Sequence, residues 1–110
     1  MIGVDVVDVA RLEAMLQRSP ELERRLFSDA ERAYCSRAQA RAVRLAGTLA
    51  AKEAVIKALR LGSLAAWTRR IEIRRAPDGA PSAFVDGREV TVSISHDGGV
   101  AVAVALAPDH

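Results

Sequence analysis

One stretch of the sequence, residues 45 to 59, is apolar around nearly its whole circumference when it is drawn as an α-helix. Most of its positions are Ala, Leu, Val or Gly, the pattern of a helix buried in the middle of a domain. Glu53 and Lys57 lie roughly 40° apart on this helix, in the same sector as apolar side chains. A buried carboxylate is costly unless a cation or hydrogen bonds meet it. The stretch therefore predicts a central helix whose charged groups need a partner or a function.

The spacing of Glu53 and Lys57 also has a purely structural explanation. A Glu that precedes a Lys by four residues forms a favourable intrahelical ion pair, worth about 0.3 kcal/mol. The spacing alone leaves both explanations open, so the rest of the chain must distinguish them.

The length of 110 residues predicts a single domain over residues 1–110 with one modest core. Half of the residues are hydrophobic, but only 4% are aromatic, and Ala and Val supply much of the remainder. A core of small side chains buries little area per residue, so we expect oligomerisation to add buried surface.

The single cysteine, Cys35, excludes an internal disulfide and fits a reducing compartment. The first eight residues contain Asp5 and Asp8 and no cation, unlike a signal peptide. No apolar run approaches the roughly 18 residues of a membrane-spanning helix. We therefore expect a cytoplasmic protein without a membrane partner.

The cations are unevenly distributed along the chain. Residues 11 to 44 hold eight Arg against five acids, although the whole chain has a formal net charge of only +2. Such a surface suits an acidic partner, either a protein or a phosphate-rich ligand. It is too dilute and too poor in aromatic residues to favour nucleic acid, so a small basic nucleic-acid-binding domain is the weakest alternative.

The first residues alternate in the manner of a strand, which places Asp5 among apolar neighbours between residues 2 and 7. Asp is disfavoured inside strands, so Asp5 indicates an edge, a bulge or a functional site. Asp8 is expected to cap the helix that follows, from residue 9 to about residue 18. Ser19-Pro20 ends this helix.

The next segments alternate between helical and irregular patterns. Residues 21 to 27 indicate a short helix or a loop, and Ser28 and Glu31 have the spacing of a capping box. The central helix is expected to end near Gly62, with a loop over residues 63 to 68.

Beyond residue 70 the hydrophobic period changes from helical to two, and Asp-Gly pairs typical of tight hairpins separate the runs. The expected strands cover residues 71–74, 82–85, 89–95 and 100–106. They predict an α+β fold in which the central buried helix packs on an antiparallel β-meander. His96 follows the third run, and its parity aims it toward the packed side; a histidine there is often only a turn residue.

Four segments in this order resemble the motifs of the holo-acyl-carrier-protein synthase family of 4'-phosphopantetheinyl transferases. They are Ile2-Gly-Val-Asp5, Phe27-Ser-x-x-Glu31, Leu45-Ala-Gly-x-x-Ala-Ala-Lys-Glu-Ala-x-x-Lys57 and Val92-Ser-Ile-Ser-His96. The resemblance spans nearly the whole chain, and the third segment is its most specific part.

The resemblance implies a magnesium-dependent enzyme that moves the phosphopantetheine arm of coenzyme A onto a serine of an apo carrier protein and releases 3',5'-ADP. It implies that the magnesium ligands are Asp5 and Glu53, and that Asp5, Glu53 and Lys57 are catalytic. It further implies that His96 and Lys52 bind coenzyme A and that Arg11 and Arg18 bind the acidic carrier. Fatty acid, polyketide and peptide carriers all stay open, as does a non-catalytic relative that only binds the carrier.

The chemistry of these residue types agrees with the implied roles. Magnesium prefers oxygen ligands and usually takes one or two carboxylates together with phosphates and water. Phosphoryl transfer depends mainly on placement and charge neutralisation, and Lys57 lies one turn beyond Glu53. Glu53 can act as a base toward the serine directly or through a metal-bound water, and both routes stay open.

This chain also departs from the pattern that it resembles. Thr48 stands where relatives commonly have Arg, Ala80 replaces a frequent Lys, and residues 60–62 replace a Gly-Thr-Gly helix end. These changes concern how the 3'-phosphate of coenzyme A is held. Residues 81 to 90 form a shorter segment than in typical members, and this difference affects the expected packing of subunits. The resemblance implies a homotrimer with active sites between neighbouring chains.

Overall fold

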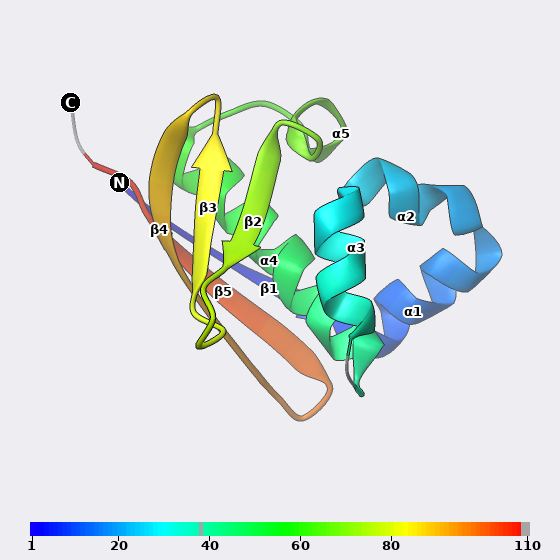
Figure 1. The fold of residues 1–110 in the computed structure, drawn as a ribbon. Helices are drawn as coiled ribbons and strands as arrows, with labels where there is room; N and C mark the ends of the chain where they lie inside the picture. Colours follow the sequence, from blue (N-terminus) through cyan, green and yellow to red (C-terminus); the bar gives the residue numbers. More distant parts are fainter. Residues whose placement is uncertain (38, 109–110) are drawn as a thin grey trace.

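The computed structural model describes residues 1–37 and 39–108, and its centre is one long helix lying on a twisted sheet (Figure 1). The helix, α4, covers Arg41–Leu59. All five strands pair antiparallel, in the order β1 (Ile2–Asp8), β5 (Val100–Leu106), β4 (Arg88–Asp97), β3 (Pro81–Val85) and β2 (Ile71–Arg75). The predicted α+β fold with a β-meander on a central helix is confirmed, and the first strand joins the meander beside the last one.

Three helices form a group at one end of α4 (Figure 1). They are α1 (Val9–Arg18), α2 (Pro20–Leu26) and α3 (Asp29–Ser36). The Asp8 side chain accepts a hydrogen bond from the Arg11 amide, and Ser28 and Glu31 form the predicted capping box. Both predicted caps are confirmed.

Several boundaries differ from the sequence-based expectation. The open choice for residues 21 to 27 resolves to a helix. Helix α4 ends at Leu59, because Arg60 takes a left-handed conformation with φ of 53° before Gly62 is reached. Residues expected to form a loop make a short helix, α5 (Leu64–Trp67). Strand β4 continues through Asp97, so His96 lies within a strand rather than after one.

Small residues allow β1 to lie directly against α4. A Cβ atom at Gly3 would lie 2.0 Å from the Ala54 carbonyl oxygen, so only glycine fits at this crossing. Every side chain of α4 from Leu45 to Lys52 is buried, as the apolar pattern predicted. This close approach places the β1 side chains next to the carboxylate of Glu53.

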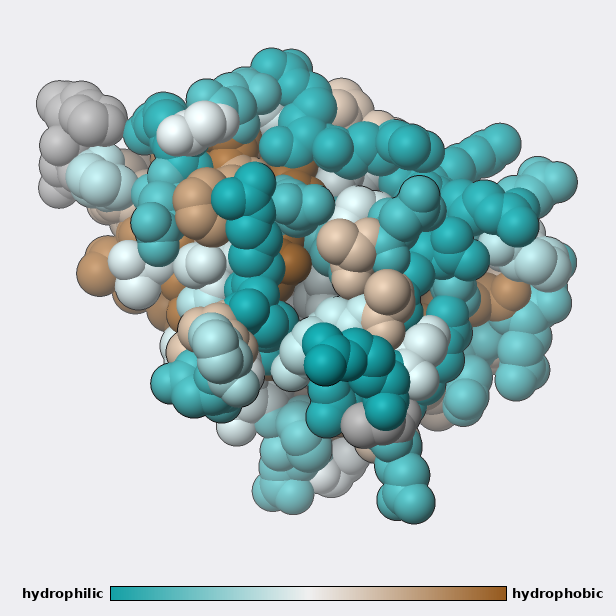
Figure 2. All heavy atoms as spheres, in the orientation of Figure 1, coloured by the Kyte–Doolittle hydropathy of each residue, from teal (hydrophilic) through white to brown (hydrophobic). Residues whose placement is uncertain are grey.

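The opposite face of β1 and β5 is apolar and exposed. It carries a stripe of large hydrophobic side chains with exposed fractions between 37% and 71%: Ile2, Val4, Val6, Val104 and Leu106. The view in Figure 2 is mostly hydrophilic, and some brown side chains emerge at its left edge. Within the described ranges, no helix has the length and hydropathy needed to cross a membrane.

Candidate active site

Two carboxylates and one amine meet where β1 crosses α4. The Lys57 amine lies 2.8 Å from Asp5 Oδ1 and donates a second hydrogen bond to the Val4 carbonyl oxygen at 3.0 Å. Within the described ranges, the ion-pair partner of Lys57 is Asp5 and not Glu53. The amine thus reaches across to the strand instead of forming a close intrahelical ion pair, although the charge of Glu53 also raises the pKa of Lys57.

The electrostatics of this cluster are unbalanced. Glu53 is half-buried, and its pKa is raised to about 7, first by burial and then by the neighbouring Asp5 carboxyl. In the part of the chain that the structure describes, Asp5 Oδ2 is buried and has no hydrogen-bond donor while Glu53 is ionised. The bond to Asp5 raises the pKa of Lys57, so this amine stays protonated at neutral pH. A buried carboxylate oxygen with too few partners indicates that the cluster can receive a further cation or donor.

The donor set suits magnesium. Asp5 and Glu53 supply hard oxygen ligands from two rigid elements, and one buried oxygen lacks a partner. Across the described chain there is no cluster of three or more His, Cys, Asp or Glu side chains placed for a metal. A pair of carboxylates nevertheless matches magnesium, which completes its shell with phosphates and water.

A largely apolar hollow of about 330 Å³ opens beside Glu53, between β1, α1 and α5. Arg11 and Met15 stand at its α1 side, and both are exposed. Arg18 is also exposed, at the far end of α1, and does not line this hollow. Arg11 is thus placed to meet a molecule that approaches Glu53.

The expectation that Lys52 binds coenzyme A requires correction. Its side chain is fully buried, and its amine contacts Glu31 Oε1 at 2.7 Å and the carbonyl oxygens of Leu26 and Thr68 at 2.8 Å each. Burial lowers the pKa of Lys52, although Glu31 opposes this shift. With its donors satisfied inside the core, Lys52 is a structural residue.

Glu31 completes this buried network. Its Oε2 accepts a hydrogen bond from the Ile73 amide at 2.7 Å, and its Oε1 accepts one from the Ser28 amide at 2.8 Å. The carboxylate therefore joins α3, α4 and β2. Sequence reasoning identified its capping role and missed the ion pair; the available signal was a second charged residue, Lys52, in the buried stretch.

His96 lies away from this cluster, near the first turn of α4. It is exposed and lines a hollow of about 350 Å³ together with Arg44, Gly47 and Ile94. Arg44 precedes Glu53 by nine residues, about 13.5 Å along the helix axis. One chain thus brings Asp5, Glu53 and Lys57 together and holds His96 in a separate hollow.

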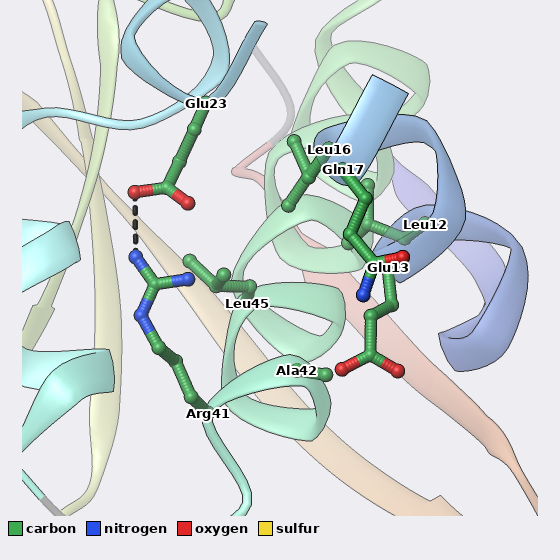
Figure 3. A pocket seen from close by; sticks show the side chains of 8 residues that line it. All are labelled: Leu12, Glu13, Leu16, Gln17, Glu23, Arg41, Ala42 and Leu45. Carbon is green, nitrogen blue, oxygen red and sulfur yellow. Dashed lines mark hydrogen bonds and ion pairs between the residues drawn. The ribbon is translucent and has the colours of Figure 1, made fainter. Parts of the chain in front are cut away.

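A third hollow, of about 220 Å³, lies between α1, α2 and α4 (Figure 3). Leu12, Leu16 and Leu45 form its apolar part, and Glu23 reaches across to Arg41. The hydrogen bond from Arg41 lowers the pKa of Glu23, and the hydrogen bond from Arg32 adds to this effect. None of the residues assigned a role from the sequence lines it, and the ion pairs tie α2 and α3 to α4.

Fold and site together describe a small α+β protein with a carboxylate pair and a lysine beside an open hollow, an arrangement suited to phosphoryl transfer. A family model described as the 4'-phosphopantetheinyl transferase superfamily matches residues 1–105. The holo-[acyl-carrier-protein] synthase of Moorella thermoacetica is 39% identical over 94% of this chain and 90% of that protein. The holo-[acyl-carrier-protein] synthase of Anaeromyxobacter dehalogenans is 41% identical over 96% of this chain and 92% of that protein.

A solved structure is similar as well. The crystal structure of Helicobacter pylori holo-[acyl-carrier-protein] synthase in complex with coenzyme A matches with a TM-score of 0.83 and 32% identity, over 96% of this chain and 98% of that chain. This chain belongs to the 4'-phosphopantetheinyl transferase superfamily. The resemblance found in the sequence is thereby confirmed.

Proposed function

We propose that this protein transfers the 4'-phosphopantetheine group of coenzyme A to a serine of an apo acyl carrier protein and releases 3',5'-ADP. Family membership supports the reaction, and relatives of similar length carry the name holo-[acyl-carrier-protein] synthase. The observation that carries the proposal is the meeting of Asp5, Glu53 and Lys57 in one open cluster.

The chemistry can be divided among the three side chains. A bond forms between the serine oxygen and the phosphorus that bears the pantetheine arm, and the bond from that phosphorus to the ADP oxygen breaks. Glu53 lines the hollow and is placed to accept the serine proton, either directly or through a water molecule. Protonated Lys57 neutralises the charge that develops on the leaving phosphate.

Asp5 and Glu53 are the residues that would hold magnesium. Magnesium held by these two carboxylates would supply positive charge to neutralise the diphosphate. The unpartnered Asp5 Oδ2 supports this assignment, because a buried carboxylate oxygen without a partner is costly in the absence of a ligand.

We assign carrier binding to the exposed arginines of α1. Arg11 stands beside the hollow that leads to Glu53, and Arg18 extends the same helix toward solvent. Guanidinium groups suit an acidic carrier surface, to which they contribute mainly association rate and orientation. His96, in the hollow near the start of α4, is assigned to coenzyme A binding.

The exposed apolar stripe supports self-association, and the resemblance implies that the assembly is a homotrimer. Val4 and Val104 lie directly opposite each other on β1 and β5, and a second copy would remove them from water. In such an assembly, the His96 hollow of one chain would complete the cluster of its neighbour. Light scattering tests this proposal, and an active monomer at working concentration would overturn it.

The decisive test is mass spectrometry of an apo acyl carrier protein after incubation with coenzyme A, magnesium and this protein. One added phosphopantetheine supports the transferase, and Glu53→Gln should modify far less of the carrier in the same time. Calorimetric titration with the carrier and with coenzyme A distinguishes the transferase from a non-catalytic protein that only binds the carrier. Such a protein would bind the carrier and leave its mass unchanged.

A further inference from the structure

Two arginines flank one tyrosine ring in the region around His96. The guanidinium carbon of Arg44 lies 5.1 Å from the centre of the Tyr34 ring, and that of Arg75 lies 5.0 Å from it. The three residues come from α4, α3 and β2, and each is half-buried. All three line both the hollow of about 350 Å³ and an adjoining one of about 550 Å³.

In the described part of the chain, these two arginines lack the ion pairs that four other arginines form. Arg32, Arg41, Arg70 and Arg74 each form an ion pair with a carboxylate, but no ion pair of Arg44 or Arg75 occurs within the described ranges. The Arg75 guanidinium group donates a hydrogen bond to the Gly79 carbonyl oxygen at 3.3 Å. The two guanidinium groups therefore leave positive charge uncompensated beside the hollows.

Other charged side chains also line the two hollows. Arg37 lines the larger one, and His96 lines the smaller one. Asp78 also lines the larger hollow, and its Oδ1 accepts a hydrogen bond from the Ala80 amide at 3.0 Å. With three arginines against one carboxylate, the lining favours an anion.

We propose that Arg44 and Arg75, held on either side of Tyr34, bind the 3'-phosphate of coenzyme A; this inference rests on the proposed function. Guanidinium groups bind phosphate through paired hydrogen bonds, and stacking on an aromatic ring fixes their planes. In the proposed function, the reacting diphosphate of coenzyme A binds at the Glu53 cluster. The 3'-phosphate is a separate group and requires a second cationic site.

The positions where the resembling family commonly has Arg and Lys offer nothing to this phosphate. The Thr48 hydroxyl is buried and bonds to the Arg44 carbonyl oxygen at 2.9 Å, and Ala80 has no polar side chain. Arg44 lies one helical turn before Thr48, so its guanidinium group reaches the same side of α4. The charge absent from positions 48 and 80 is thus supplied by positions 44 and 75.

Calorimetric titration with two nucleotides tests the proposal. The first is adenosine 3',5'-bisphosphate and the second is adenosine 5'-phosphate, which lacks the 3'-phosphate. The wild type should bind the bisphosphate at least about tenfold more tightly, as expected for charge-assisted hydrogen bonds. Arg44→Gln and Arg75→Gln should each remove most of this preference and leave the affinity for adenosine 5'-phosphate within about twofold.

Arg74→Gln is the matched control. Arg74 neighbours Arg75 on β2 and also stacks on an aromatic ring, that of Phe84 at 4.0 Å, but it is paired with Glu72. This variant should keep the full preference. Arg75→Lys keeps the positive charge but loses the paired guanidinium donors, so it should retain an intermediate preference. This variant tests the proposal if the glutamine variants fold poorly.

The proposal is overturned if the wild type shows no preference, or if the glutamine variants weaken both nucleotides equally. Transfer to the apo carrier is measured separately by mass spectrometry. A protein that transfers without a preference contradicts this inference alone, and one that prefers the bisphosphate without transfer contradicts only the proposed function.

Discussion

Two lysines of α4, five residues apart, each contact a carboxylate of another element, and their surroundings are opposite in character. Lys52 is fully buried, and its amine contacts Glu31 and two carbonyl oxygens. Lys57 is 56% exposed and contacts Asp5, whose second oxygen has no partner, while the neighbouring Glu53 has a raised pKa. A satisfied buried network stabilises a fold, and an unsatisfied, accessible one is available for ligands and chemistry.

The largest expected effect is on turnover. Glu53→Gln keeps the shape of the side chain and removes the base, so transfer to the carrier should fall about a hundredfold to ten-thousandfold. Mass spectrometry of the carrier over time gives the rate. Glu89→Gln, at an exposed strand position, is the control and should retain the wild-type rate. Equal rates for Glu53→Gln and the wild type would remove Glu53 from the chemistry.

Substitution in the buried Lys52–Glu31 pair should change the stability of the fold. Lys52→Met leaves Glu31 as an unpaired charge in the core and should lower the free energy of unfolding by about 3 to 5 kcal/mol. Lys57→Met, on the exposed side of the same helix, should cost less than about 1 kcal/mol. Urea unfolding of both variants measures the difference. Similar losses would show that the two lysines do not divide into structural and functional roles.

Local chemistry allowed much of this division to be anticipated from the sequence. Asp5 and Glu53 were identified because charge is unusual in an apolar strand and an apolar helix, and the caps were identified by spacing alone. Lys52 could not be separated from Lys57, since that requires knowing which neighbours lie against each side of α4. The Tyr34, Arg44 and Arg75 cluster was missed because its members come from three elements and share no motif.

The pH dependence of the free energy of unfolding should reflect the raised pKa of Glu53. Its pKa is about 7 in the folded protein against an ordinary value of 4.5, so the folded state keeps a proton that the unfolded state has released. Without divalent ions, the free energy of unfolding should therefore fall as pH rises from 4.5 to 7. After allowance for solvent exposure, this contribution is about 1 to 2 kcal/mol.

Glu53→Gln is the control for this pH series. It should lack the decline and be more stable than the wild type at pH 8, while being far less active. Chemical unfolding at several pH values in the presence of a chelator provides the measurement. A wild type and variant with parallel pH profiles would contradict the raised pKa.

A smaller effect is expected at the carrier surface. Arg11→Glu reverses a charge beside the hollow that contains Glu53, so the KM for the carrier should rise about tenfold. The KM for coenzyme A should stay unchanged, because Arg11 lies away from the Tyr34 cluster. Steady-state kinetics with each substrate varied in turn distinguishes the two. Equal losses for both substrates would indicate a damaged fold rather than a lost carrier contact.

The dependence of turnover on magnesium concentration in Asp5→Asn tests most directly whether the open group is a metal-binding catalytic site. Asparagine keeps one oxygen and loses the charge, so the variant should need far more magnesium than the wild type to reach half of its own maximal rate. A magnesium dependence identical to that of the wild type would contradict the assignment of Asp5 and Glu53 as a shared ion site.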